Sequence, residues 1–153
     1  MIDNDFPLIS DWPKCDYAVV GMVLFDARNR VACQLRDDFE HVAGGGMWSI
    51  FGGHHEPPES LVETAVREVN EELGLMTKPE DFEPLLRMVP ADGLQAYHYY
   101  YRYKKPVLPH DFRLDEGAGF AFLHAEQARN MPFMASARHV LTYLEKHKMI
   151  AMR

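Results

Sequence analysis

The chain has 153 residues, of which 47% are hydrophobic and 25% are charged, a composition typical of one globular domain with a sizeable core. Its formal net charge of -7 at pH 7 disfavours nonspecific binding to nucleic acid or to an anionic membrane. An anionic substrate would therefore need a local cluster of positive charge. We expect a single domain over residues 1–153, present as a monomer or a homodimer.

The cellular location follows from what the apolar segments and the cysteines indicate. The longest apolar runs are too short to span a bilayer, and the acidic start, with Asp3 and Asp5, lacks the basic region of a signal peptide. Cys15 and Cys33 have neither CxxC nor zinc-site spacing, so we expect two reduced thiols, with Cys33 packed in the core. The sequence thus predicts a cytoplasmic protein that is not inserted in a membrane.

The first third of the chain predicts strands joined by turns. An apolar run of β-branched and aromatic residues predicts a buried strand, and a turn followed by a second run completes a hairpin. A flexible glycine-rich loop and a short apolar strand then lead to a glycine pair. In chain order these segments are residues 17–25, 26–30, 31–36, 44–46 and 47–51, followed by Gly52 and Gly53.

The next segment predicts an α-helix with clearly marked ends. Ser60 is a suitable N-cap, Glu63 completes a capping box, and Gly74 stands where a left-handed C-cap is favoured. The apolar residues between them fall on one helical face, which we expect to be buried. These residues are Leu61, Val62, Ala65, Val66, Val69 and Leu73.

The rest of the chain predicts a second hairpin, a strand and a helix. Residues 83–90 and 94–103 flank Asp92-Gly93, a strong signal for a hairpin turn. Tyrosines alternate with other residues along the second strand, which gives it two distinct faces, and one face is a candidate pocket wall. Residues 120–123 predict a strand and residues 135–148 an amphipathic helix. The sum is an α/β fold, a mixed sandwich.

Three glutamates of the predicted helix carry the strongest chemical signal. Glu68, Glu71 and Glu72 have i,i+3 and i,i+4 spacing, so a helix places their carboxylates on one narrow arc beside the apolar face. Like charges repel there, whereas a hard divalent cation turns the repulsion into a site of oxygen ligands suited to Mg²⁺ or Mn²⁺. The alternative is a salt-bridged surface helix, and metal binding explains the pattern better.

Two neighbouring features would complete the cation site. Arg67 lies four residues from both Glu63 and Glu71, so it can pair with either and restrict its rotamers. Gly52 and Gly53 allow the chain to turn sharply and to bring a bare backbone carbonyl close to a metal. Loop and helix together are expected to form the cage.

The stretch from Gly53 to Leu75 resembles the Nudix box. The box consists of Gly, five residues, Glu, seven residues, Arg-Glu, an aliphatic residue, one residue, Glu-Glu, one residue, Gly and an aliphatic residue. Two positions depart from frequent family choices, because Pro58 replaces a glycine and Phe51 a proline. The matching residues are Gly53, Glu59, Arg67, Glu68, Val69, Glu71, Glu72, Gly74 and Leu75.

This resemblance implies a MutT-like, Nudix-type α/β/α sandwich with a mixed sheet. It also implies a Mg²⁺-dependent hydrolase that cleaves a phosphoanhydride bond in a nucleoside diphosphate linked to a group X, such as a nucleoside triphosphate or a nucleotide sugar. The partner would be a small nucleotide-type molecule. The alternative is a non-catalytic Nudix-fold domain that senses a ligand or binds a protein, a role that normally goes with a degraded box.

The resemblance also implies roles for individual residues. The three box glutamates would be the core metal ligands together with Gly52, and Glu59 would orient Arg67 or the metal shell. Glu68 is the first candidate for the base, an assignment that differs among family members. Many relatives use a glutamate outside the box for a further metal contact, and here Glu116 is the candidate, with an acidic turn as the alternative.

Substrate contacts are expected from residues outside the box. Arg36 is a candidate for phosphate binding, or else a surface arginine paired with Asp37 or Asp38. Trp48, Tyr17 and Tyr99 are candidates for stacking on a base, although aromatic residues in strands belong to the core more often. His54 and His55 do not form an HExxH zinc motif and are expected to be loop residues near the substrate.

Overall fold

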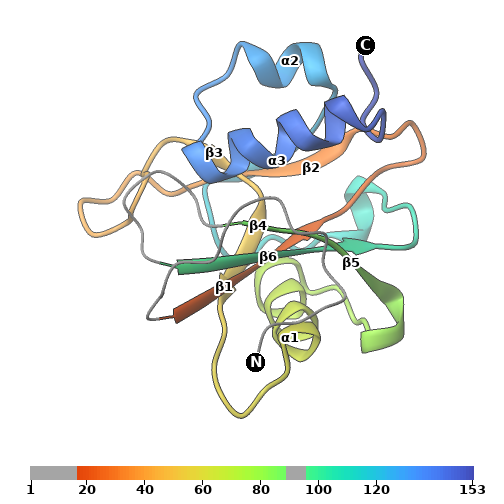
Figure 1. The fold of residues 1–153 in the computed structure, drawn as a ribbon. Helices are drawn as coiled ribbons and strands as arrows, with labels where there is room; N and C mark the ends of the chain where they lie inside the picture. Colours follow the sequence, from red (N-terminus) through yellow and green to blue (C-terminus); the bar gives the residue numbers. More distant parts are fainter. Residues whose placement is uncertain (1–16, 89–95) are drawn as a thin grey trace.

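The computed structural model describes residues 17–88 and 96–153 of the chain. Helices lie on both sides of a central sheet, with α1 on one side and α2 and α3 on the other (Figure 1). In chain order the elements are β1 (Tyr17–Val23), β2 (Val31–Leu35), β3 (Trp48–Ser49), β4 (Phe51–His54), α1 (Leu61–Leu73), η1 (Pro79–Asp81), β5 (Phe82–Met88), β6 (Ala96–Tyr103), η2 (Pro109–Asp111), β7 (Gly119–Leu123), α2 (Ala125–Arg129) and α3 (Ala135–Lys146).

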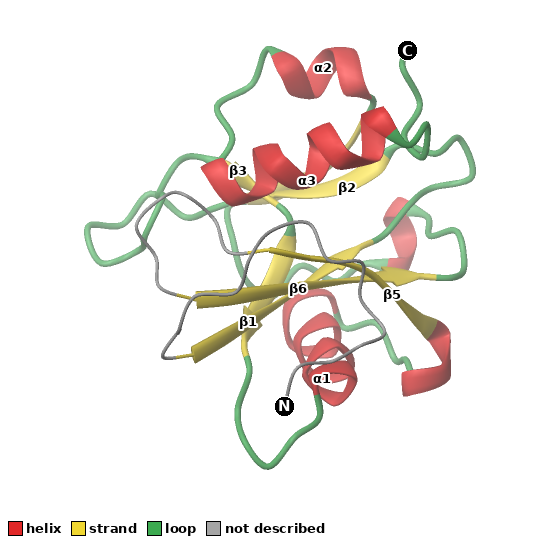
Figure 2. Cartoon of the chain, in the orientation of Figure 1, coloured by secondary structure: helices red, strands yellow, loops and turns green. Residues whose placement is uncertain are grey.

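The strands form two sheets (Figure 2). The larger has the order β4-β1-β6-β5, in which β1 and β6 are parallel and the other neighbours antiparallel. The smaller, β3-β2-β7, is antiparallel throughout. The predicted α/β sandwich with a mixed sheet is therefore confirmed, and the second sheet is an addition to it.

The predicted hairpin of the first two strands is wrong beyond its turn. The turn forms, since the Asp26 N–H donates to the Arg30 carbonyl at 3.0 Å and Phe25 bridges Val31. The strands then separate into different sheets. The physical reason is that β1 pairs with β4 along one edge and with β6 along the other, which leaves no edge for β2.

The segment that was predicted as one strand over residues 47–51 is also divided. Its first part, β3, joins the small sheet, and its second part, β4, joins the large one and continues through the glycine pair. The glycines therefore lie in a strand rather than in a sharp turn. Gly52 faces Gly21 of β1, and a side chain on Gly52 would collide with the Val20 carbonyl, so the pair permits close approach of backbones.

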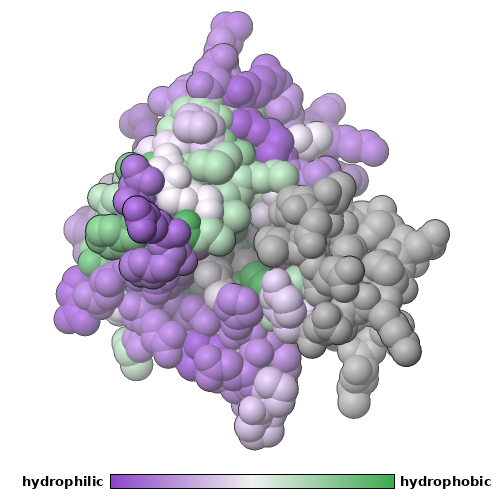
Figure 3. Space-filling model, turned by 90° about the vertical axis from the view of Figure 1, so that its left-hand side faces the viewer, coloured by the Kyte–Doolittle hydropathy of each residue, from purple (hydrophilic) through white to green (hydrophobic). Residues whose placement is uncertain are grey.

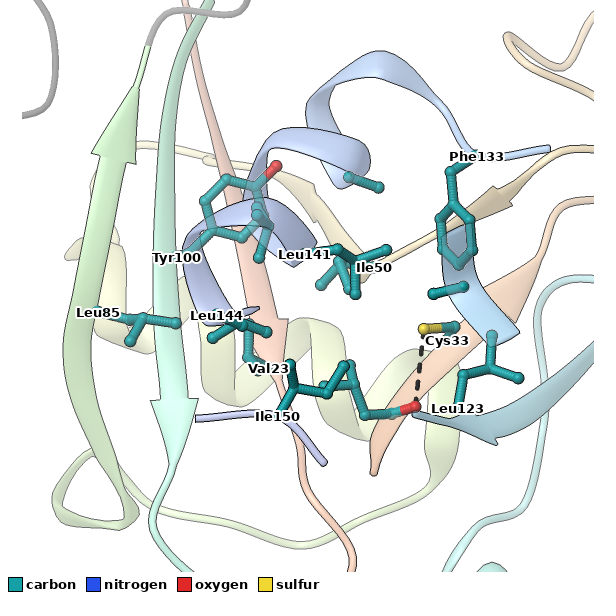
Figure 4. Close-up of a cluster of buried hydrophobic side chains, with 14 of the residues drawn as sticks. Val23, Cys33, Ile50, Leu85, Tyr100, Leu123, Phe133, Leu141, Leu144 and Ile150 are labelled. Carbon is teal, nitrogen blue, oxygen red and sulfur yellow. Dashed lines mark hydrogen bonds between the residues drawn. The ribbon is translucent and has the colours of Figure 1, made fainter. Parts of the chain in front are cut away.

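Two apolar clusters fill the space on either side of the large sheet. One joins the sheets to α2 and α3, and includes the labelled residues of Figure 4, among them Cys33, whose thiol donates weakly to the Val31 carbonyl. The other lies against α1 and contains Ala65, Val69 and Leu73. Both faces of the large sheet are therefore covered, as its apolar strands require.

The second predicted hairpin is confirmed in its strands, because β5 and β6 pair antiparallel, while Asp92-Gly93 lies outside the described residues. The expected pocket wall on β6 is wrong. Tyr99, Tyr101 and Tyr103 pack in the α1 cluster and Tyr100 packs in the opposite one, so both faces of the strand belong to the core. Among the described residues, no helix is long and apolar enough to cross a membrane.

Candidate active site

The helix α1 begins and ends as its sequence predicts. The Ser60 hydroxyl accepts from the Glu63 N–H at 3.4 Å, and the Glu63 carboxylate accepts from the Ser60 N–H at 2.7 Å, which completes the capping box. Gly74 ends the helix with φ of 63° and donates its N–H to the Asn70 carbonyl. These two caps fix the register in which the helical glutamates meet the sheet.

The buried face of α1 is not the purely apolar one that the sequence predicts. Glu68 and Glu72 are only 8% and 2% exposed, whereas Leu61 and Val62 are half-buried. Two carboxylates therefore lie within the buried face, not beside it. The glycines of β4 make the burial of Glu68 possible, because a side chain on Gly53 would collide with the Glu68 carboxylate.

Glu72 is the more deeply buried of the two carboxylates. Burial raises its pKa to about 9, and the charges of Glu116 and Glu68 add to the increase. The Gly52 N–H donates to Oε2 of Glu72 at 3.0 Å and opposes the shift, as does the charge of Arg36. Without a cation, burial therefore favours the protonated, neutral form of the Glu72 carboxyl.

Arg67 links the helix to the loop before it. Its Nε donates to Oε1 of Glu59 at 2.7 Å, and its Nη1 donates to Oε1 of Glu68 at 2.7 Å. The same Nη1 reaches Oε2 of Glu71 at 3.2 Å, and Nη2 reaches the His54 carbonyl at 3.0 Å. One guanidinium therefore restrains three carboxylates and the end of β4.

These contacts set the protonation of the carboxylates around Arg67. Hydrogen bonds from Arg67 hold the pKa of Glu59 below its ordinary value. Burial raises the pKa of Glu68, although the Arg67 hydrogen bond works in the opposite direction. The expected pairing of Arg67 with Glu71 is present, but that with Glu63 is absent because the Glu63 carboxylate caps the helix.

A side chain that sequence reasoning missed supports this arrangement. The fully buried Thr64 hydroxyl lies 3.0 Å from Oε2 of Glu59, to which it donates, and 3.0 Å from Nδ1 of His55. Its only signal in the sequence is a polar residue beside the apolar positions of the helix. His55 therefore contacts the box residues through Thr64, whereas His54 contacts Arg67 with its backbone carbonyl.

The segment after η2 brings Glu116 to the box. The N–H groups of Arg113 and Asp115 donate to the carbonyls of Leu73 and Glu72 at 2.8 and 2.9 Å, which docks this segment on the end of α1. Glu116 itself is exposed, yet its charge is close enough to help raise the pKa of both buried glutamates, after the effect of burial. The structure thus places a fourth carboxylate beside the cluster.

Arg36, just after the end of β2, is close enough to Glu72 for its charge to act on that carboxyl. It is half-buried, and its Nε donates to the Ala43 carbonyl at 2.7 Å rather than to either neighbouring aspartate. Its charge acts on the pKa of Glu72, which places a cation next to the acidic cluster. A positive charge therefore lies within electrostatic reach of the buried carboxyl of Glu72.

The aromatic candidates for substrate contact differ in whether their rings are accessible to solvent. Tyr99 is 5% exposed within the α1 cluster, so of the two interpretations offered for it the core position holds and it is removed from the stacking candidates. Tyr17 is exposed and packs on the ring of His54, with 5.4 Å between ring centroids. Trp48 is half-buried, and its ring centroid lies 6.5 Å from that of Phe133, which precedes α3.

The oxygen atoms of the box suit a hard cation, although the carboxylates are engaged in other hydrogen bonds and do not converge on one point. Over residues 17–88 and 96–153, no three histidine, cysteine or carboxylate side chains converge closely enough to hold an ion. Arg67 engages Glu68 and Glu71, and Gly52 engages Glu72. The donors are all oxygens, and two are buried carboxylates that repel each other, so a divalent cation of the Mg²⁺ type fits them chemically.

Comparisons with known proteins agree with this geometry. A NUDIX domain model matches residues 17–144. Phosphatase NudJ of Escherichia coli (strain K12) is 30% identical over 80 residues, which are 50% of this chain and 52% of NudJ, so the chain spans about half the length of this curated relative.

Solved structures share the fold at low sequence identity. The NUDIX domain of Shewanella oneidensis NrtR, complexed with ADP ribose, gives a TM-score of 0.70 at 15% identity and covers 88% of this chain and 90% of its own. MutT from a study of Aliivibrio salmonicida and Vibrio cholerae gives 0.68 at 17% identity, with coverage of 86% and 98%. These structures establish a common fold, and the matched domain model establishes the family.

Proposed function

Because the chain belongs to the Nudix family, we propose that it is a Mg²⁺-dependent hydrolase that cleaves a phosphoanhydride bond in a nucleoside diphosphate linked to another group. The observation that carries the proposal is the burial of Glu68 and Glu72 next to a glycine strand. Burying two like charges costs free energy unless a cation joins them. In a hydrolase such an acidic cluster can bind the metal ion that catalysis needs, whereas in a purely structural helix it would only lower the stability of the fold.

The box residues would hold the ion and orient it. Glu68, Glu71 and Glu72 each engage one carboxylate oxygen in the bonds described above, and we expect them to be the ligands, with the Gly52 carbonyl completing the set. When bound, Mg²⁺ or Mn²⁺ would activate water and neutralise charge on the diphosphate. Arg67 would give up some of its hydrogen bonds to Glu68 and Glu71 to the metal and would still orient these side chains.

The general base would be one of the box glutamates. Glu68 is the first candidate, because Arg67 holds one of its oxygens and burial raises its pKa toward the range in which a carboxylate accepts a proton. Glu59 has a different role. It anchors Arg67 through two hydrogen bonds, of 2.7 and 3.2 Å, and would thus orient the ligands without touching the substrate.

Residues beside the box would bind the rest of the substrate. Arg36 would hold a phosphate group, given its place next to Glu72. Figure 3 shows a hydrophobic area bordered by hydrophilic residues on the side toward which the segment between β2 and β3 projects. A nucleobase would stack on an aromatic ring, and the rings of Tyr17 and Trp48 remain our candidates for that contact.

The substrate would be a small nucleotide, either a nucleoside triphosphate or a nucleotide sugar. The box contacts the diphosphate and the metal, so the remaining group is selected by residues outside it. The ADP ribose in the NrtR domain shows that this fold can hold a molecule of the second class, but at 15% identity it does not select that class for this chain. The MutT likeness favours neither class, because it establishes the fold alone.

A hydrolysis screen tests the proposal. Purified protein is incubated with nucleoside triphosphates, nucleotide sugars, dinucleoside polyphosphates and coenzyme A, with Mg²⁺ or Mn²⁺, and released phosphate and pyrophosphate are measured. We expect turnover of at least one substrate, loss of turnover in excess chelator, and loss in Glu72→Gln. Glu83→Gln, which changes a half-buried carboxylate of β5 that pairs with Arg102 outside the box, is the control. Full turnover in chelator, or tight binding of every candidate without turnover, would overturn the proposal.

A further inference from the structure

Gln34 is a buried polar side chain in the middle of the small sheet. It lies in β2, pairs with Ser49 of β3 and Phe120 of β7, and is 3% exposed. An apolar residue would fill this position without the cost of burying an amide. The buried amide of Gln34 therefore needs a hydrogen-bond partner.

That partner is the backbone that carries Glu116. The Nε2 of Gln34 donates to the Glu116 carbonyl at 3.1 Å, across 82 residues of sequence. The strand alternation explains the reach, because Gln34 shares a strand face with Ala32, which packs in the α1 cluster. The amide thus points from the small sheet toward the acidic cluster.

Two further contacts hold the same segment. The Gly117 N–H donates to Oδ2 of Asp37 at 3.2 Å, and the Ala118 N–H donates to the Leu35 carbonyl at 2.9 Å. Gly117 has a φ of 92°, and a side chain there would press on Gln34, so the turn depends on glycine. Together with the docking of Asp115 on Glu72, these bonds fix the backbone on both sides of Glu116.

We propose that Gln34 is a positioning residue for Glu116, which it holds beside Glu68 and Glu72 by bonding its carbonyl and packing against Gly117. Asp37 assists by accepting the bond from the Gly117 N–H. The inference rests on the proposed function for its effect on turnover, because Glu116 can affect turnover only if a reaction takes place at the box. The contacts of Gln34 with Glu116 and Gly117, which we call the clamp, belong to the fold and can be measured without any substrate.

The first arm of the test is structural. Gln34→Met keeps the length of the side chain but removes the donor, and amide hydrogen exchange in metal-free protein is followed by mass spectrometry. We expect exchange of peptides covering residues 113–118 to accelerate about 10-fold, while peptides from α1 keep their wild-type rates. Cys33→Ala is the matched control, because Cys33 is the preceding residue of β2 but packs in the opposite cluster. Unchanged exchange in Gln34→Met would overturn the clamp.

The second arm is kinetic and separates positioning from general stability. We expect Gln34→Met to lower kcat about 3- to 30-fold with KM nearly unchanged, and to have almost no further effect in a Glu116→Gln background. Multiplying effects in the double variant would mean that Gln34 does not act through Glu116. If wild-type protein turns over no substrate, the proposed function fails, whereas the exchange experiment still decides the clamp.

Discussion

Oε2 of Glu72 on α1 accepts a hydrogen bond of 3.0 Å from the backbone N–H of Gly52 in β4. This bond ties the most buried carboxylate of the cluster to the bare strand beside it. It also stabilises the charged form of Glu72, yet burial outweighs it and raises the pKa to about 9. Without a cation, the site is therefore expected to take up a proton near neutral pH.

The pH dependence of stability follows from that shift. The folded-state pKa of Glu72, about 9, lies above the ordinary value of 4.5, so the stability that its buried proton contributes is fully present below pH 4.5 and declines as pH rises toward 9. We expect the Tm of metal-free protein to fall by about 5 °C from about pH 6 to about pH 9. Thermal melts in chelator would measure it, and Mg²⁺ should reduce the decline.

The control for this prediction is a neutral residue of the same shape. Glu72→Gln should flatten the slope of Tm against pH, because it removes the buried group whose pKa is raised to about 9. Glu83→Gln removes one carboxylate of β5 outside the cluster, where it pairs with Arg102, and should leave the slope unchanged. A wild-type Tm that stays level across this range would contradict the assignment of the buried proton.

Glu71 should show opposite effects on stability and on activity. Its side chain is 56% exposed and receives the 3.2 Å bond from Arg67. Glu71→Gln removes one charge from a crowded cluster, so metal-free protein should melt at the same temperature or slightly higher, while metal affinity and turnover fall sharply. Melts with and without Mg²⁺ would test this pair of effects. A clear loss of Tm without metal would show that Glu71 is structural.

The helix and its carboxylates could be predicted because their signals are local. The Ser60 and Gly74 caps and the spacing of the glutamates all lie within one helix, and the structure reproduces the helix between these caps. The burial of Glu68 and Glu72 was not visible in the sequence. It depends on the glycines of β4, whose place in the sheet is set by pairing with a distant strand.

Strand partners were the least predictable part of the fold for the same reason. The turn at Asp26 is local and formed as expected, but β1 is enclosed by β4 and β6, and β6 comes more than seventy residues later. The contact between Gln34 and Glu116 likewise spans 82 residues. No periodicity within one segment indicates which distant segment a buried amide will reach.

Thr64 should affect turnover through Glu59 and Arg67. Thr64→Val keeps the shape of the side chain but removes the hydroxyl that donates to Glu59 at 3.0 Å. The loosened Glu59 would restrain Arg67 less well, so we expect kcat to fall about 2- to 10-fold with little change in KM. Steady-state kinetics would measure the change.

Thr142 offers the matched comparison for Thr64. It lies in α3, and its hydroxyl bonds the Arg138 carbonyl within its own helix. Thr142→Val should therefore leave turnover unchanged, which separates the loss of a helical hydroxyl from the loss of the Glu59 contact. Equal kinetics for the two variants would show that Thr64 does not act through the box.

Glu116 should contribute to catalysis although it lies outside the box. Its charge already influences both buried glutamates, and an octahedral Mg²⁺ that also meets two phosphate groups leaves room for a carboxylate from another element. We expect Glu116→Gln to lower kcat about 10- to 1000-fold with little change in KM or Tm, the pattern of a contact made mainly in the transition state. Steady-state kinetics and thermal melts would measure both.

Asp115 provides the control on the same segment. Its side chain pairs with Arg113 at 2.9 Å on the surface, and the bond that docks this segment on α1 comes from its backbone N–H. Asp115→Asn keeps that N–H and should change kcat much less than Glu116→Gln does, because an exposed ion pair contributes little. If Glu116→Gln retains wild-type kcat on the best substrate while Glu71→Gln abolishes turnover, the segment is only an acidic turn and the chemistry is confined to the box.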